Sequence, residues 1–184
     1  MGFHTFPIDR ADALEDPSRY RFCSREELVE MLDLDADAVV ADLGSGTGFY
    51  TRDVAPFVET LYAVDVQAEM HDRHREEGRA ETVEFLTTGV GSLPFGDGDL
   101  DAAFSTMTHH EYATAETLAE LGRVIRSGGR LVTVDWSATG TGEDGPPVDE
   151  RFGPAEVASQ LEEAGFTIDR VHDRPETFAV VARR

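Results

Sequence analysis

The stretch Val39-Val40-Ala41-Asp42-Leu43-Gly44-Ser45-Gly46-Thr47-Gly48 decides the fold. Its first half is an apolar run that ends at an acidic residue, which is typical of a buried strand, and its second half has glycine at every other position. Glycine adopts positive φ and leaves the backbone bare, so a ligand can approach the N–H groups of such a turn closely. An ordinary strand-to-helix turn needs one or two glycines. The stretch therefore predicts a strand that leads into a ligand-binding loop.

The spacing of the glycines separates the candidate ligands. A dinucleotide fingerprint, G-x-G-x-x-G, would place its third glycine at position 49, which is occupied by Phe49. A phosphate-binding P-loop needs a lysine beside its phosphates, and all 16 basic residues here are arginines. The order D-x-G-x-G-x-G resembles instead the class I S-adenosylmethionine-dependent methyltransferases. That resemblance implies that the methionine end of the cofactor is held by Asp42, Gly44, Ser45, Gly46 and Gly48.

Later segments extend the resemblance over residues 38–136. The run Leu61-Tyr62-Ala63-Val64-Asp65-Val66 ends in an acidic residue, and a carboxylate at that place accepts the hydroxyls of a ribose. In the family an acidic residue then holds the adenine amino group, but Gly89 or Val90 stands at that place here. The resemblance therefore implies that adenine is held by backbone groups and by apolar contacts. The further cofactor-binding residues that it implies are Val66, Met70, Gly91, Leu93 and Ser105.

Two adjacent histidines are the candidates for the chemical step. Methyl transfer is an in-line displacement that depends mostly on positioning, although an oxygen or carbon nucleophile still needs a base. His109 and His110 follow the fourth expected strand, where the substrate should lie, and imidazole titrates near neutral pH. We expect one of them to act as base and the other to orient or pack. Weaker candidates for the same role are Tyr20, Glu111 and Tyr112.

The order of apolar segments predicts the fold class. From residue 38 onward strand-like runs alternate with helical ones, which indicates a parallel sheet covered by helices on both faces. The short link at 173–175 permits only a hairpin, so the last strand should be antiparallel. We expect an α/β, doubly wound, three-layer Rossmann-like domain with a seven-stranded, mostly parallel sheet. The expected strands are 38–43, 60–66, 82–87, 99–106, 129–136, 166–172 and 176–182, and the expected helices are 48–56, 67–78, 113–126 and 154–164.

The whole chain, residues 1–184, is expected to form a single domain in three parts. Residues 1–36 form an irregular arm (1–23) and a helix whose N-cap is Ser24, residues 37–136 form the cofactor-binding core, and residues 137–184 form a loop, a helix and the terminal hairpin. The loop at 137–147 is rich in glycine and proline and is expected not to fold locally. It is either a lid over the substrate or a plain surface loop. Trp136 either stacks on a planar substrate or covers the core.

Composition restricts the partners. With 37 acidic and 16 basic residues the formal charge is −21, which suggests a protein adapted to concentrated salt and disfavours nucleic acid. A single cysteine, Cys23, excludes an internal disulfide, and the chain shows neither a leader peptide nor a membrane span, so we expect a cytoplasmic protein. His71 and His74 have no third ligand nearby and are expected on a solvated helix face, so no metal is expected.

We expect S-adenosylmethionine as cofactor, S-adenosylhomocysteine as product and a small-molecule acceptor, as in the small-molecule and quinone-type branch of the family. A nucleic-acid methyltransferase should show a basic face, and one that acts on adenine should show an Asn/Asp-Pro-Pro-aromatic run where this chain has Ser105-Thr106-Met107-Thr108. A methyltransferase that acts on a protein, or a binding module without activity, stays open. A nicotinamide oxidoreductase is disfavoured by Phe49. The oligomeric state, monomer or homodimer, is open as well.

Overall fold

The computed structural model describes residues 5–78 and 80–184, and these form one seven-stranded sheet with the strand order β3-β2-β1-β4-β5-β7-β6. Residues 1–4 of the expected arm lie outside the described residues. The predicted fold class is confirmed, and six of the seven strands begin and end within one residue of the predicted positions. The strands are β1 (Val39–Leu43), β2 (Thr60–Asp65), β3 (Val83–Thr87), β4 (Leu100–Thr106), β5 (Ile125–Trp136), β6 (Thr167–Asp173) and β7 (Thr177–Arg183).

The first five strands are parallel, and β7 runs antiparallel to both β5 and β6. The antiparallel pairing follows from the tight link between β6 and β7, as the sequence predicts. Because parallel strands end at the same edge, the segments that follow β1, β2, β4 and β5 all meet at one edge of the sheet. We call this the carboxyl edge.

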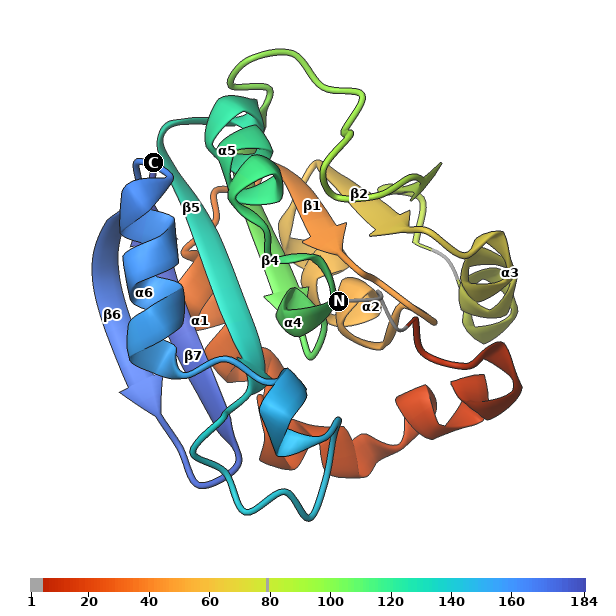
Figure 1. Cartoon of the computed structure of the whole chain (residues 1–184). Helices are drawn as coiled ribbons and strands as arrows, with labels where there is room; N and C mark the ends of the chain where they lie inside the picture. The colour runs from red at the N-terminus through yellow and green to blue at the C-terminus, as the bar shows by residue number, and fades with distance from the viewer. Residues whose placement is uncertain (1–4, 79) are drawn as a thin grey trace.

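Helices cover both faces of the sheet. The α-helices are α1 (Arg25–Leu32), α2 (Phe49–Val54), α3 (Ala68–Glu77), α4 (His109–Tyr112), α5 (Ala115–Val124) and α6 (Pro154–Glu163). Figure 1 shows α5 and α6 in front of the sheet and α1 and α2 behind it. Side chains alternate along β1, so that Val40 belongs to the apolar cluster with α1 and α2, whereas Ala41 and Leu43 belong to the cluster with α5 and α6. The sheet is thus the middle of three layers. Within the described residues no helix is long and apolar enough to cross a membrane.

The fifth strand begins earlier than predicted. The helix expected at 113–126 is α5, which ends at Val124, and β5 begins at Ile125 rather than at residue 129. The glycine pair Gly128-Gly129 therefore does not stop the helix but lies inside β5, where the pairing with β4 shifts from Leu100↔Ile125 to Ala102↔Arg130. A side chain at Gly129 would meet the carbonyl oxygen of Asp101 at 2.6 Å, so close packing of the irregular strand requires glycine there. Gly128 has a positive φ of 79°, which also favours glycine.

The segment before α1 is more ordered than expected. It forms two 3-10 helices, η1 (Ile8–Glu15) and η2 (Pro17–Arg21). Elsewhere in the chain there are two shorter 3-10 helices, η3 (Ala55–Phe57) and η4 (Val148–Glu150). Ser24 caps α1 as predicted, since its hydroxyl accepts a hydrogen bond from the N–H of Glu27 at 3.2 Å. In Figure 1 residues 5–23 (red) and the loop before α6 (cyan) lie along the carboxyl edge, toward which the arrowhead of β1 points. These two segments border the candidate site.

Candidate cofactor and active site

The glycine loop between β1 and α2 has the strained, bare backbone that the sequence predicts. Gly44, Gly46 and Gly48 have φ values of 74°, 53° and 82°, which L side chains rarely adopt. Close neighbours add a second reason for two of them. A Cβ atom at Gly44 would lie 2.2 Å from Cγ2 of Thr108, and one at Gly48 would lie 2.3 Å from the ring of His74. The loop is thus enclosed by α3 on one side and by the residue before α4 on the other.

Asp42, the last polar residue of β1, is buried beneath this loop. Its Oδ2 accepts a hydrogen bond from the Thr51 hydroxyl at 2.6 Å, whereas Oδ1 has no hydrogen-bond partner among the described residues. The hydroxyl of Ser45 lacks one in the same part of the chain. Burial raises the pKa of Asp42 to about 7, because the carboxylate is poorly solvated there. An unpartnered carboxylate oxygen below a bare loop fits the ammonium group of a methionine end.

Asp65, the last residue of β2, lies beside the same loop. One carboxylate oxygen accepts the N–H of Gly46 at 2.9 Å, and the other accepts the N–H of Gln67, also at 2.9 Å. Each oxygen keeps a further lone pair. The carboxylate is thereby held in one orientation at the carboxyl edge, where a ribose could donate to it. Asp42 and Asp65 come from adjacent strands and lie on two sides of one loop.

The remaining predicted cofactor residues differ in exposure. Val66 is 55% exposed, whereas Met70 and Leu93 are nearly buried, Leu93 within the apolar cluster that contains α5. Ser105 is fully buried near the end of β4. Gly91 follows β3 and faces the hydroxyl of Thr117, which a Cβ atom would approach to 3.2 Å. Val66 thus follows Asp65 at the end of β2, and Ser105 lies near the end of β4. Met70 and Leu93 are buried.

His110 is paired by hydrogen bonds with Asp135, a partner that the sequence did not identify. Its Nδ1 lies 3.0 and 3.1 Å from the two carboxylate oxygens of Asp135, and its backbone N–H donates to the same carboxylate at 2.7 Å. Asp135 is buried in β5. Burial alone would lower the pKa of His110, but the hydrogen bond and the charge of Asp135 outweigh it and raise that pKa. A histidine that donates through Nδ1 offers Nε2 as a proton acceptor.

His109 occupies a different environment although it is the next residue. It is fully buried against the rings of Tyr112 and Phe152, with centroid distances of 5.3 and 5.9 Å. Burial lowers its pKa to about 4, so the ring is neutral at ordinary pH. Glu111 lies on the other side of His110, with its Oε1 4.0 Å from Nε2, and burial raises its pKa to about 7. Of the two predicted histidines, His110 is the one with an orienting carboxylate.

One expectation for other residues is wrong. His71 and His74 do not lie on a solvated face; both are buried, with ring contacts to Phe85 at 5.0 Å, because α3 turns this face toward β3 and the glycine loop. Among the described residues no group of three or more His, Cys, Asp or Glu side chains that could hold a metal ion is present.

The loop at 137–147 contains no helix or strand of its own and is organised by the buried side chain of Arg151, which lies beyond it in the sequence. That guanidinium donates to the carbonyl oxygens of Ser137, Asp144 and Pro146 and lies 3.8 Å from a carboxylate oxygen of Glu176. Trp136 packs against Gly145 and edge-on against Phe22, with ring centroids 4.7 Å apart. The indole therefore covers the junction between the loop and the N-terminal segment.

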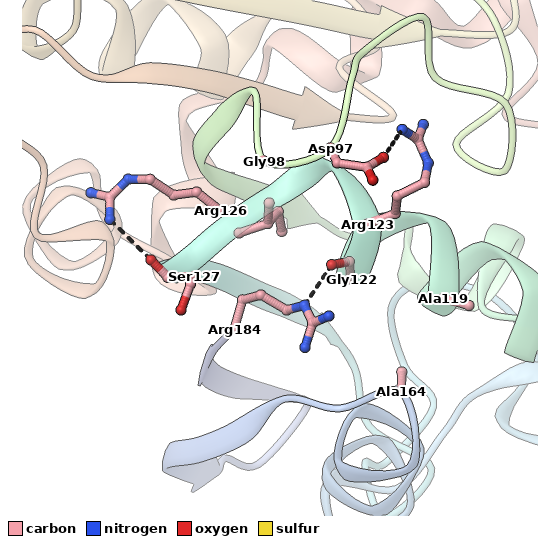
Figure 2. A pocket seen from close by; sticks show the side chains of 10 residues that line it. Asp97, Gly98, Ala119, Gly122, Arg123, Arg126, Ser127, Ala164 and Arg184 are labelled. Carbon is pink, nitrogen blue, oxygen red and sulfur yellow. Dashed lines mark hydrogen bonds and ion pairs between the residues drawn. The ribbon is translucent and has the colours of Figure 1, made fainter.

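A cleft of about 600 Å³ lies away from these residues. Figure 2 shows residues that line it at the end of α5 and the beginning of β5. Because it lies where β5 begins, the cleft is at the edge of the sheet opposite the carboxyl edge. Its arginines are already engaged: Arg123 with Asp97 at 3.0 Å, Arg126 with Asp101 at 2.6 Å, and Arg184 with the carbonyl oxygen of Gly122. Because these arginines already have partners and the candidate residues lie at the other edge, we do not assign the reaction to this cleft.

Asp135 could have been found from the sequence, since it is an acidic residue near the end of an apolar strand, like Asp42 and Asp65. Arg19 also lies at the site, with its guanidinium carbon 5.2 Å from the ring centroids of Phe49 and Tyr50. No periodic pattern marks the segment that contains it. Only the tertiary structure brings Arg19 to the glycine loop.

Comparison with known proteins agrees with this geometry. A family model described as a methyltransferase domain matches residues 41–133. The chain is 32% identical over 145 residues to the methyltransferase GfsG of Streptomyces halstedii. This match covers 74% of the present chain and 52% of GfsG. An uncharacterized methyltransferase of Mycobacterium tuberculosis is 33% identical over 147 residues, covering 78% of this chain and 55% of its own.

The crystal structure of a SAM-dependent methyltransferase from Aquifex aeolicus superimposes with a TM-score of 0.87 at 30% identity. The match covers 96% of this chain and 98% of that one. The chain spans about half the length of the curated relatives it matches.

Proposed function

Because the chain belongs to the class I S-adenosylmethionine-dependent methyltransferases, we propose that it transfers a methyl group from S-adenosylmethionine to a small-molecule acceptor. The observation that carries the proposal is the segment Thr108–His110. Thr108 donates to the carbonyl oxygen of Gly44 at 3.3 Å, and two residues later His110 pairs with Asp135. One short segment therefore joins the cofactor loop to a candidate base.

The cofactor residues in this proposal are those at the carboxyl edge. When bound, the sulfonium group of the cofactor supplies an activated methyl group. Asp42 and the loop Gly44–Gly48 would hold its methionine end, Asp65 would accept the ribose hydroxyls, and Val66, Met70, Gly91, Leu93 and Ser105 would surround the rest. The unpartnered oxygen of Asp42 and the fixed carboxylate of Asp65 support this assignment.

His110 is the proposed base. Asp135 fixes the ring through Nδ1, so that Nε2 is oriented to accept a proton from the acceptor as the new bond forms. The carboxylate also stabilises the imidazolium that results. We assign no proton transfer to His109, whose ring is packed in the core.

A small acceptor is supported by charge and by named relatives. A net charge of −21 disfavours a nucleic-acid substrate, and a demethylmenaquinone methyltransferase of Tropheryma whipplei is 30% identical over 115 residues. A protein acceptor, or cofactor binding without catalysis, is the alternative. The same charge supports a protein that works in concentrated salt, and the free, buried thiol of Cys23 supports a cytoplasmic location.

The proposal is tested by following the methyl group. The protein is incubated with S-adenosylmethionine carrying a labelled methyl group and a low-molecular-mass extract of the source cells, and label is counted in small-molecule and protein fractions. We expect label in the small molecules, and a rate lowered by about 10²- to 10⁴-fold in His110→Asn.

The matched control is His172→Asn, an exposed histidine on β6, which should leave the rate unchanged. Label in the protein fraction would favour the alternative acceptor. A full rate in His110→Asn would remove this histidine from the mechanism.

A further inference from the structure

We propose that Arg19 binds the carboxylate of the cofactor's methionine end, so that the N-terminal segment and β1 together recognise a zwitterion through Arg19 and Asp42. The inference rests on the proposed cofactor. It adds a ligand from outside the segment that carries the methyltransferase motifs, since the family model begins at residue 41.

The N-terminal segment is fixed to the glycine loop by several contacts. A Cβ atom at Gly46 would lie 3.3 Å from Cδ1 of Leu14, so Leu14 covers that glycine. Glu15 forms an ion pair with Arg52, which in turn donates to the carbonyl oxygen of Thr47 at 2.9 Å. These contacts hold the end of η1 against the loop.

Further hydrogen bonds fix the backbone of η2 itself. The hydroxyl of Tyr50 lies 3.1 Å from the carbonyl oxygens of Arg19 and Cys23. Tyr50 belongs to the first turn of α2, directly after Gly48. The backbone of Arg19 is therefore held against the helix that the glycine loop leads into.

The guanidinium of Arg19 is held but not neutralised. It lies against the rings of Phe49 and Tyr50, and Nη1 donates to the carbonyl oxygen of Leu14 at 2.7 Å. Among the described residues no carboxylate forms an ion pair with it, although the chain has 37 acidic residues. Other arginines of similar or greater burial, Arg52, Arg151 and Arg174, are all paired with glutamates. Placing an unpaired guanidinium in a partly buried position is costly, and an anionic ligand removes that cost.

The carboxylate of Asp42 restricts which anionic ligand can bind next to Arg19. Burial lowers the pKa of Arg19, and the neighbouring Tyr50, Glu15 and Asp42 partly offset this. No hydrogen bond joins Arg19 to Asp42 in the described part of the chain, but Arg19 packs on the two residues that follow the glycine loop, beneath which Asp42 is buried. The carboxylate would repel a phosphate or another simple anion. A free amino-acid end has both an ammonium for the unpartnered Oδ1 of Asp42 and a carboxylate for the fork of N–H groups on Arg19.

The test compares two cofactors that differ only in this carboxylate. The affinities of S-adenosylmethionine and decarboxylated S-adenosylmethionine are measured by calorimetric titration for the natural protein, Arg19→Gln and Arg21→Gln. Arg21 lies on the same short helix, is exposed and pairs with Asp144, so it serves as the matched control. We expect the natural protein and the control to prefer the complete cofactor by roughly 10- to 100-fold. In Arg19→Gln we expect this preference to fall to nearly one.

Binding of the decarboxylated cofactor serves as the folding control, because Arg19→Gln should leave it unchanged. An undiminished preference in Arg19→Gln, or an equal loss for both cofactors, would overturn the assignment and leave the proposed function intact. A natural protein that binds neither compound would contradict the proposed function itself.

Discussion

At the scale of single residues, neighbouring side chains of one type acquire opposite properties from their partners. His109 and His110 are adjacent, yet the pKa of the first falls to about 4 and that of the second rises. Both lose solvation, but only His110 hydrogen bonds to a carboxylate. The sequence identified the pair as candidates and could not rank them, because the partner, Asp135, is 25 residues away.

The first prediction concerns that partner. With the carboxylate of Asp135 present, His110 should titrate above the ordinary value of about 6.5. In Asp135→Asn only the charges of Glu111 and Glu150 still oppose burial, so the pKa of His110 should fall. The measurement is an NMR titration of the imidazole signals. The same linkage predicts that Asp135→Asn costs most stability below about pH 6.5, where His110 is charged, and less as the pH rises through the raised pKa.

The control is Asp173→Asn, at the exposed end of β6, which should leave the His110 titration unchanged. If Asp135→Asn does not move the pKa of His110, Asp135 does not set its charge. The base would then lack its orienting group.

At the scale of elements, the glycine loop depends on a helix that is distant in sequence. The buried ring of His74 occupies the space where a side chain at Gly48 would lie. From the sequence, His74 was expected in solvent, since α3 is rich in charged residues and its apolar face is short. Contacts of this kind depend on how a helix is rotated against the sheet, which local periodicity defines poorly when few apolar residues are present.

The second prediction separates backbone strain from this contact. Gly48→Ala combines a positive φ of 82° with a clash at 2.3 Å, whereas Gly98→Ala has a similar φ of 74° and meets Arg126 only at 3.4 Å. We expect Gly98→Ala to lower the free energy of unfolding by about 1–2 kcal/mol and Gly48→Ala by about 1–3 kcal/mol more. Urea denaturation measures both. Equal losses would show that His74 does not restrict the loop.

Element boundaries show where sequence reasoning succeeds and where it fails. Six strands and most helices follow from apolar runs and their turns, and Ser24 caps its helix as predicted. The start of β5 was misplaced, because Gly128-Gly129 is a common helix stop and here serves an irregular strand. The loop at 137–147 has no helix or strand of its own, as expected, and the sequence did not show that Arg151, which lies beyond it, would organise it. Long-range partners of this kind leave no local signal.

At the scale of the whole molecule, the topology gathers the candidate site. Parallel strands β1, β2, β4 and β5 end at one edge, and each contributes a polar residue there: Asp42, Asp65, Ser105 and Asp135. The first three were named as cofactor-binding residues from the strand ends together with the resemblance to the methyltransferases. The N-terminal segment, with Arg19, closes the same edge from outside the motif-bearing core (Figure 1). The position of Arg19 depends on tertiary contacts, and no local pattern in the sequence marks it.

The most direct test of the central claim is a calorimetric titration of the protein with S-adenosylmethionine and, separately, with NAD, in molar and in dilute salt. The test variant is Asp65→Ala, and the control variant is Asp72→Ala, on the exposed face of α3. The account predicts micromolar binding of S-adenosylmethionine alone, at least as tight in molar salt, lost in Asp65→Ala and retained in Asp72→Ala. Absence of binding in either salt, or preference for NAD, would contradict it.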